Sequence, residues 1–416
     1  MDHTDRYQNI LKKINQYTSG EQGITRIAYS NVEQACTHAF MRMCKDAKME
    51  VRLDQAGNLI ARRDGKNNLL PPVVIGSHLD TVYNGGKYDG AVGVTSALEV
   101  IHRLNEKEII TDHPIEIISF ACEESSRFGV ATVGSKAMAG TLEKERYRNL
   151  KDRDGITMEK VFSLCALDLN QIDQSSRVHE TFKVFLEIHI EQGPVLEMEN
   201  KSIGIVTGIA APARFIARIQ GKPSHSGTTP MHLRKDALLG AAEIALELEK
   251  AAVREEEYGT VATVGVFDVK PGAMNVVPGE TEIKIDIRST SKDSRERVLS
   301  HLYTTVSSIQ KRRGLNIALT EISMDEPVLL SQEVIYSIEQ ICAEKGLSYR
   351  LMQSGAGHDA MNMMGLGPVG LIFIPSEGGI SHNPSEYTKI EDILTGIELL
   401  EAAVLKYASD FTDGIM

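Results

Sequence analysis

Hydrophobic and polar positions follow two different periods along the first half of the chain. A short apolar run at 73–75 and an alternating run at 115–120 predict buried strands. Between them, 91–107 has the apolar spacing of an amphipathic helix. In 182–190 the even positions are apolar, which predicts a strand with His189 on its polar side. This series of strand, helix and strand favours a layered α/β domain.

The pattern changes near residue 209 and changes back near residue 326. The intervening stretch predicts strands and two long helices, enough for a small α+β domain of its own. We therefore predict one domain inserted into another. The outer domain is formed by 1–208 and 326–416, and the inserted domain by 209–325.

Composition narrows the class of protein. The chain has 416 residues, 42% of them hydrophobic and 25% charged, which predicts a globular protein of two domains. Its net charge of −12 argues against binding to nucleic acid or to an anionic membrane, because both need a cationic surface. Five cysteines without a C-x-x-C pair argue against a disulfide framework. No apolar run resembles a signal peptide or approaches the roughly 20 residues of a membrane helix, so we expect a cytoplasmic protein.

One histidine and two aspartates lie in the glycine-rich stretch 76–90. His78 follows a predicted strand, where α/β folds place ligand-binding loops. Asp80 can bond the far nitrogen of the His78 imidazole and fix its tautomer. Asp89 precedes a predicted helix, where it can bind a metal or cap the helix. Because Asp and Gly also favour turns, a purely structural explanation stays open for each residue alone.

Further candidates stand at the ends of other predicted strands. Glu123 and Glu124 come directly after the strand segment "IEIISFAC" (115–122), and adjacent strand residues face opposite ways. One of these carboxylates can therefore bind metal while the other moves protons, although a solvated acidic pair at a turn is an alternative. His382 lies in a Gly/Ser/Pro-rich loop after another predicted strand.

Taken together, these candidate residues indicate a metal site more specifically than any one of them does alone. Three histidines and a glutamate around one shared aspartate can form a binuclear site for divalent ions. The candidate ligands are His78, Asp89, Glu124, His189 and His382.

The motifs that hold these residues resemble the M20 metallopeptidase clan, in the same order over nearly the whole chain. Within the clan, "GSHLDTVYNGGKYDG", "EIHIEQG", "SHSGTTPM", "NVVPG", "SGAGHDA" and "GISHNP" resemble the amidase subfamily. That subfamily contains N-carbamoyl-L-amino acid hydrolases, allantoate amidohydrolases and β-ureidopropionases. The resemblance implies an α/β catalytic domain with a mixed sheet flanked by helices. It also implies an inserted α+β, ferredoxin-like domain that acts as a lid and in dimerisation.

The resemblance also assigns the metal site. It implies two divalent ions per subunit, and imidazole and carboxylate ligands suit manganese, zinc, cobalt or nickel. Glu123 would be the general base, and Asp80 would support the ligands. The ions would be held by His78 and His189 on one side and by Glu124 and His382 on the other, with Asp89 bridging them.

A further set of residues is implied to contact the substrate. His225 would stabilise the oxyanion from the inserted domain of the partner subunit. Asn275 and Arg288 would bind the substrate's carboxylate, since the guanidinium fork matches two oxygens. Gln192 would add a polar contact, and Gly357 belongs to a loop expected to line the substrate.

The sequence therefore predicts a metal-dependent amidohydrolase that cleaves the ureido C–N bond of N-carbamoyl-L-amino acids to amino acid, ammonia and carbon dioxide. Its partners would be a small ureido acid and a second copy of itself, without nucleic acid or membrane. Three alternatives stay open. They are an allantoate amidohydrolase, a dipeptidase or aminoacylase of the wider clan, and a catalytically silent metal-binding homologue.

Overall fold

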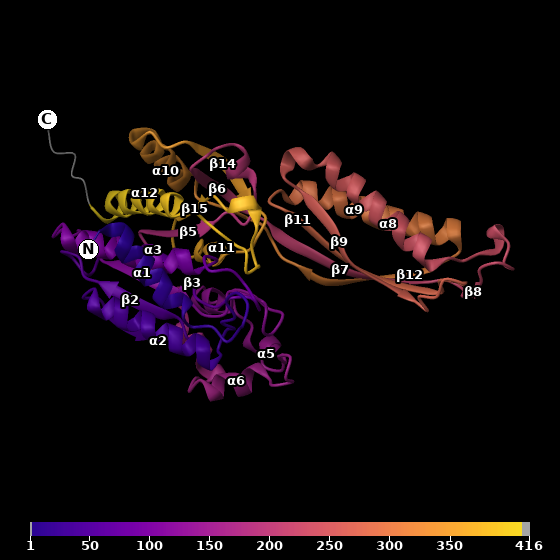
Figure 1. Ribbon diagram of the computed structural model, residues 1–416, viewed down its shortest axis with the longest axis horizontal. Coiled ribbons are helices and arrows are strands. Elements are labelled where there is room, and N and C mark those ends of the chain that lie inside the picture. The colour runs from indigo at the N-terminus through magenta and orange to yellow at the C-terminus, as the bar shows by residue number, and fades with distance from the viewer. Residues whose placement is uncertain (1, 410–416) are drawn as a thin grey trace. The chain divides into compact units, whose positions relative to one another are not determined.

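The computed structural model describes residues 2–409, which fall into two compact units (Figure 1). The first unit contains residues 2–207, 330–352 and 358–409. The second unit contains 208–329 and also 353–357. The sequence pattern assigned 353–357 to the outer domain. In the structure this short segment bonds to the second unit, because Arg288 donates to the Gly355 carbonyl at 2.8 Å.

The first unit is built on a mixed sheet, which agrees with the predicted α/β class, and only its last strand, β13 (Val328–Leu329), consists entirely of residues assigned to the second unit. The strand order is β1-β2-β4-β3-β5-β15-β6-β13, and β14 also pairs with β6. The strands are β1 (Glu50–Leu53), β2 (Leu59–Arg63), β3 (Val73–His78), β4 (Ile115–Phe120), β5 (Val184–Ile190), β6 (Ile203–Ile209), β13 (Val328–Leu329), β14 (Tyr349–Ser354) and β15 (Val369–Ile374).

Helices cover both faces of this sheet. Gly396 of α12 lies so close to Ile188 of β5 that a Cβ there would approach it to 2.4 Å. On the opposite face, the Ala360 amide at the start of α11 donates to Glu187 at 3.1 Å. All seven residues of β5 are consequently buried, including the polar side that the alternation predicted. The helices are α1 (His3–Asn15), α2 (Asn31–Asp46), α3 (Ala91–Glu106), α4 (Val133–Met138), α5 (Lys144–Tyr147), α6 (Met158–Leu164), α7 (Val195–Met198), α10 (Gln332–Lys345), α11 (Ala360–Met363) and α12 (Ile390–Ala408), with 3₁₀ turns η1 (Leu169–Ser175) and η4 (Glu377–Gly379).

The second unit is an antiparallel sheet with two helices on one face (Figure 1). Burial alternates along β11, so one side of the sheet meets the helices. Phe215, Ile244, Ile285 and Leu302 belong to the core between them. In the order β12-β7-β11-β9 the strands are β12 (Asn316–Met324), β7 (Ala211–Gln220), β11 (Glu280–Ser289) and β9 (Val261–Lys270), with helices α8 (Ala237–Arg254) and α9 (Lys292–Arg313), the short pair β8 (Ser224–His225) and β10 (Val276–Val277), and turns η2 (Met231–Leu233) and η3 (Glu256–Tyr258).

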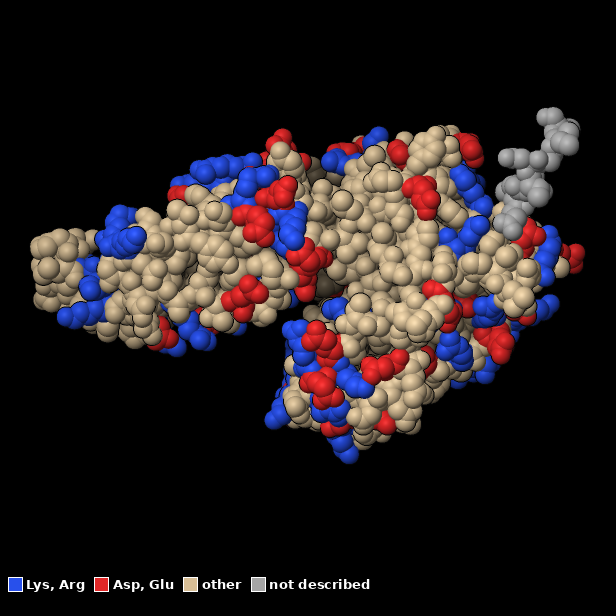
Figure 2. Space-filling model, turned by 180° about the vertical axis from the view of Figure 1, so that it is seen from behind, with Lys and Arg blue, Asp and Glu red and all other residues tan. Residues whose placement is uncertain are grey.

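The surface carries charge of both signs. On the face seen in Figure 2, acidic and basic side chains are interspersed. Among residues 2–409, no helix combines the length and hydrophobicity that a membrane span needs.

Candidate metal centre

The candidate ligands lie at the carboxyl ends of four neighbouring parallel strands. The strands β4, β3, β5 and β15 are adjacent in the sheet, and each pair of neighbours runs parallel. His78 ends β3, and His189 is the last residue but one of β5. Glu124 follows β4, and His382 follows β15. Since parallel strands end at the same edge of a sheet, the topology itself brings these side chains together.

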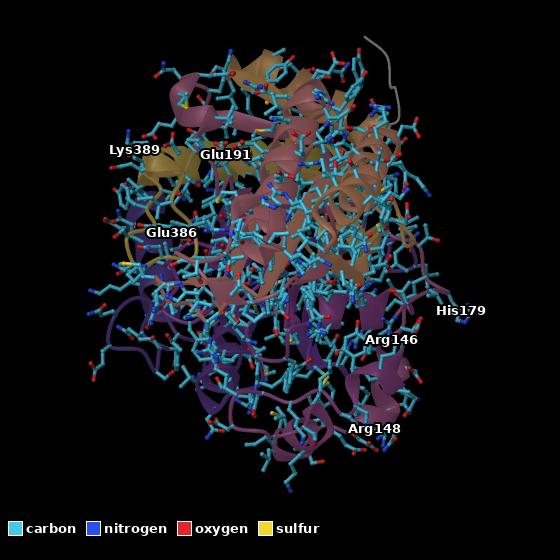
Figure 3. The ribbon with its side chains drawn as sticks, turned by 90° about the vertical axis from the view of Figure 1, so that its right-hand side faces the viewer. Arg146, Arg148, His179, Glu191, Glu386 and Lys389 are labelled. Carbon is cyan, nitrogen blue, oxygen red and sulfur yellow. The ribbon has the colours of Figure 1, made fainter. Side chains whose placement is uncertain are left out.

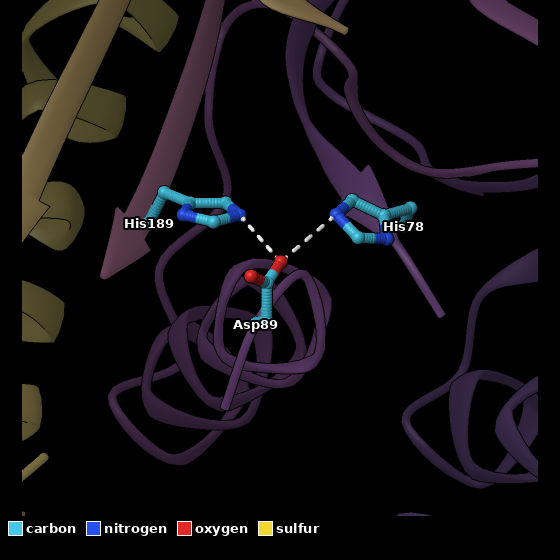
Figure 4. Close-up of side chains that lie close together, drawn as sticks. All are labelled: His78, Asp89 and His189. Carbon is cyan, nitrogen blue, oxygen red and sulfur yellow. Dashed lines mark ion pairs between the residues drawn. The ribbon is translucent and has the colours of Figure 1, made fainter. Parts of the chain in front are cut away.

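Asp89 lies at the centre of the cluster. Its Oδ1 is 3.5 Å from His78 Nε2 and 3.3 Å from His189 Nε2 (Figure 4). Its Oδ2 is 3.4 Å from His382 Nε2, and that nitrogen is also 3.4 Å from Glu124 Oε1. Two groups of possible metal donors therefore share this one carboxylate, and within each group the donor atoms lie within 4.8 Å of one another.

Backbone carbonyl groups orient two of the histidines. His78 Nδ1 lies 2.9 Å from the Asp80 carbonyl, and His189 Nδ1 lies 2.9 Å from the Ile190 carbonyl. A carbonyl only accepts, so each Nδ1 carries a proton, and Nε2 is the ring nitrogen that remains for a metal ion. The Gly90 amide donates to His189 Nε2 at 3.2 Å, which agrees with that tautomer. Both Nε2 atoms lie within 3.5 Å of Asp89 Oδ1, so the three donors can share one metal ion.

Asp80 has a different partner from the one that the sequence predicted. Its carboxylate is 3.8 Å from His78 Nδ1, beyond hydrogen-bonding distance. Instead, it accepts from the amides of Glu123 at 3.1 Å and Glu124 at 3.0 Å. The backbone carbonyl of Asp80, and not its side chain, holds the imidazole, while the side chain fixes the backbone of the two glutamates.

Burial and neighbouring charges shift the pKa values of the carboxyl groups in the cluster. Burial raises the pKa of Glu123 well above its usual value, against the lowering effect of His78 at 3.7 Å. Burial, with help from Asp89, raises the pKa of Glu124 to about 7. Although burial opposes it, the histidines hold the pKa of Asp89 well below normal. Closely spaced carboxylates in a buried site are stabilised by a bound cation. The donor atoms of this cluster therefore fit divalent metal ions.

Two polar residues near Asp89 complete this arrangement. Gln192 Nε2 donates to Asp89 Oδ2 at 2.6 Å, and Ser381 Oγ donates to the same oxygen at 3.0 Å. The backbones of Gln192 and His382 have φ of 59° and 55°. Non-glycine residues rarely adopt this left-handed conformation, and it is concentrated at functional sites. Gln192 was among the residues predicted from the sequence. Ser381 was not, and only its position in the motif "GISHNP" could have indicated it.

The remaining candidates lie in the second unit, at two separate ends of its sheet. His225 and Asn275 are neighbours, since Val276 pairs with His225 and the Ser226 amide donates to the Asn275 carbonyl at 3.0 Å. Arg288 lies at the other end of β11, where its guanidinium bonds Asp286 at 2.9 Å. Between Arg288 and Glu280, β11 spans about 25 Å at roughly 3.3 Å per residue. One chain therefore does not bring His225 and Asn275 together with Arg288, and Gly357 belongs to the segment that bonds near Arg288.

Comparison with known proteins decides the family. Residues 74–406 match the model of peptidase family M20/M25/M40. The chain belongs to this family. It is 44% identical over 404 residues to an uncharacterized hydrolase of Haemophilus influenzae, covering 97% of this chain and 98% of that one. It is 37% identical over 389 residues to an N-carbamoyl-L-amino-acid amidohydrolase of a Pseudomonas strain, with coverage of 93% and 94%. It is 33% identical over 386 residues to the allantoate amidohydrolase of Escherichia coli, covering 93% of each.

A solved structure agrees with this assignment. The hydantoinase/carbamoylase-family amidase of Burkholderia multivorans superposes with a TM-score of 0.91 at 32% identity, covering 98% of both chains. The predicted family, α/β fold and amidohydrolase class are thereby confirmed. Enzymes of this family use divalent metal ions, and the donor groups around Asp89 are suited to them.

Proposed function

We propose that this protein is a metal-dependent amidohydrolase that cleaves the ureido C–N bond of N-carbamoyl-L-amino acids, releasing amino acid, ammonia and carbon dioxide. The observation that carries the proposal is the pair of donor groups that share Asp89, beside the buried carboxyl group of Glu123. Similarity to an N-carbamoyl-L-amino-acid amidohydrolase at 37% identity supports this choice of substrate.

The chain offers donors for two ions. In this proposal His78 and His189 hold one ion, Glu124 and His382 hold the other, and Asp89 bridges them. Manganese, zinc, cobalt and nickel all suit these ligands. When bound, the ions lower the pKa of a water molecule and polarise the carbonyl group of the substrate.

Glu123 is the proposed general base. It is buried, is not one of the five ligands, and its Oε2 lies 3.7 Å from His78 Nε2. A raised carboxyl pKa brings a base closer to neutral pH, where proton transfer in both directions is efficient. Glu123 would take a proton from the attacking water and return it to the departing nitrogen. Asp80 supports this role by holding the Glu123 amide.

Polar residues outside the ligand set would bind the substrate. Gln192 Oε1 is buried and has no hydrogen-bond partner among residues 2–409, so it can accept from the ureido group. Arg288 would bind the substrate's carboxylate, with Gly357 lining the same region. His225 would stabilise charge on the carbonyl oxygen, and Asn275 would bind the carboxylate together with Arg288.

The separation within the second unit supports a homodimer. β11 separates its Glu280 end, next to which His225 and Asn275 lie, from Arg288 by about 25 Å, too far for one small acid to contact all three. We therefore propose that His225 and Asn275 of one subunit serve the substrate held by Arg288 of the other, with the second unit acting as lid and dimerisation domain.

Allantoate is the second candidate substrate, since it also has a ureido group beside a carboxylate and the E. coli allantoate amidohydrolase is 33% identical. Peptides or N-acyl amino acids would be the substrates if the protein were a dipeptidase or aminoacylase of the wider clan. A catalytically silent protein is disfavoured, because a non-enzyme needs no buried base beside a full set of ligands.

Ammonia release by purified, manganese-loaded protein tests the proposal. The panel contains N-carbamoyl-L-amino acids, N-carbamoyl-β-alanine, allantoate and N-acetyl amino acids, each with and without chelator, and Glu123→Gln is the inactive control. We expect chelator-sensitive release that is fastest from an N-carbamoyl-L-amino acid. Fastest release from allantoate would establish the second candidate instead. No release from any ureido acid by the metal-loaded protein would refute the proposal.

A further inference from the structure

The side chain of Glu386 reaches from one ligand-bearing loop into another. It lies in the segment between β15 and α12, and Lys389, which is also labelled in Figure 3, directly precedes that helix. Only 3% of the residue is exposed. Its Oε1 accepts from the amides of Tyr88 at 2.9 Å and Asp89 at 3.1 Å. A residue almost 300 positions away in the sequence thus holds the backbone at the shared carboxylate.

The other oxygen of Glu386 contacts the loop that bears His382. Ser381 Oγ lies 3.3 Å from Glu386 Oε2 and 3.0 Å from Asp89 Oδ2. The hydroxyl group therefore stands between the two carboxylates, and the next residue is His382. Through these contacts Glu386 connects the backbone of Asp89 to the donors of the second group.

Gly86 provides the space that this contact needs. A Cβ at Gly86 would lie 2.0 Å from Glu386 Oε1 and from its carboxyl carbon. The backbone of Gly86 is not in the left-handed region, so its glycine is required by the close approach of the carboxylate and not by φ. Gly86 and Glu386 are far apart in the sequence, but the close contact between them requires both residues.

We propose that Glu386 is a positioning residue that fixes Asp89 and the Ser381–His382 loop relative to each other, so that the donor groups can bind metal. Glu386 does not itself lie among the donors of either group. This inference rests on the proposed metal site but is independent of the substrate. Residues that orient metal ligands typically change metal affinity about 10–100-fold when they are replaced.

Four variants test the proposal: Glu386→Ala, Glu386→Gln, Gly86→Ala and the double variant Gly86→Ala/Glu386→Ala. Manganese and zinc affinity and stoichiometry are measured by chelator competition, and unfolding of the metal-free protein is followed separately. Matched controls are Glu377→Ala, an exposed glutamate of the same segment, and Gly365→Ala, where an added Cβ meets nothing within 4 Å.

We expect Glu386→Ala and Gly86→Ala each to weaken metal binding by about 10–100-fold, with both controls unchanged. Glu386→Gln should stay close to the parent, because its amide oxygen still accepts from both amides. The double variant should equal Glu386→Ala, since the Cβ at position 86 has room once the carboxylate is gone. This non-additivity distinguishes positioning from two unrelated losses of stability.

Parental metal affinity in Glu386→Ala, whatever its stability, would overturn the proposal. So would equal losses in Glu386→Gln and Glu386→Ala, or additive losses in the double variant. If Glu386→Ala does not fold, Gly86→Ala and Glu386→Gln decide by the same measurement. Because metal binding is measured without substrate, failure of the parent protein to hydrolyse ureido acids refutes the proposed function and leaves this result intact.

Discussion

Replacement of Asp80 offers a sharp test of how the site is built. The carboxylate of Asp80 is 1% exposed and accepts from the amides of Glu123 and Glu124. Asp80→Ala leaves both buried amides without an acceptor, and each such loss costs about 1–3 kcal/mol. The free energy of unfolding should therefore fall by about 2–6 kcal/mol. That is a large part of the roughly 5–15 kcal/mol of a typical domain.

Asp80→Asn provides a graded comparison at the same position. Its amide oxygen can accept from one of the two glutamate amides, but its NH₂ group cannot accept from the other. The expected loss is therefore about half that of Asp80→Ala, or roughly 1–3 kcal/mol. The free energy of metal binding at His78 should change less than the free energy of unfolding, because the carbonyl of residue 80 still orients the imidazole.

Urea unfolding of the metal-free variants measures this loss. The chain contains no tryptophan, so far-UV circular dichroism is a suitable probe. Asp154→Asn, at an exposed aspartate, is the control. Asp80→Ala with the parental free energy of unfolding would refute the assigned hydrogen bonds. A loss confined to metal affinity would favour the imidazole contact that the sequence predicted for the Asp80 side chain.

Three further predictions concern the metals and the second unit. Glu123→Gln should retain metal binding and lose about 10²–10⁴-fold in kcat, and loss of bound metal would contradict the role of base. The hydrogen bond to Asp89 raises the pKa of His382 to about 9, from a usual 6.5. The folded state thus binds more protons between these values, so stability of the metal-free protein should fall as pH rises from 6.5 to 9. Thermal unfolding with His382→Asn as control measures this fall, and an equal slope in the variant would contradict it. Finally, mixing inactive His225→Ala and Glu123→Gln subunits should restore about a quarter of parental activity in ammonia release, because half of the dimers formed are mixed and each has one intact site. No recovery after verified subunit exchange would exclude donation of His225 between subunits.

Much of the fold follows from the hydrophobic pattern. The run at 115–120 corresponds to β4, Ile115–Phe120, because an alternating segment has few other ways to bury its apolar side chains. The pattern could not show that the polar side of β5 is also buried, since that depends on α11, far along the chain. For the same reason 353–357 was assigned to the outer domain, although a hydrogen bond from Arg288 connects it to the second unit.

The candidate ligands were predictable as residues at strand ends and from motifs that resemble the family, whereas the strand order that brings them together became known only from the structure. Side chains that follow parallel neighbouring strands must meet, so His78, His189, Glu124 and His382 converge once the strands are assigned. The contact between Glu386 and the Asp89 amide was not predictable in this way, because it joins two loops whose path no periodicity describes. In the sequence, neither the glutamate after "SHNPS" nor the glycine at position 86 indicates this contact by itself. The structure shows that the two residues lie against each other.

Asp80 and Glu386 share a physical role that explains why a metal-binding motif contains more acids than ligands. The backbone turns sharply at Cys122 and Gly90, with φ of 55° and 64°, just beside the amides that these acids accept from. Amides in such turns have no partner in a helix or sheet, and a buried amide without a partner is costly. The side chains of Asp80 and Glu386 each accept two of these amides at once. Counting acids near a histidine therefore overestimates the ligands, because the same strand ends that present ligands also leave amides that require buried acids.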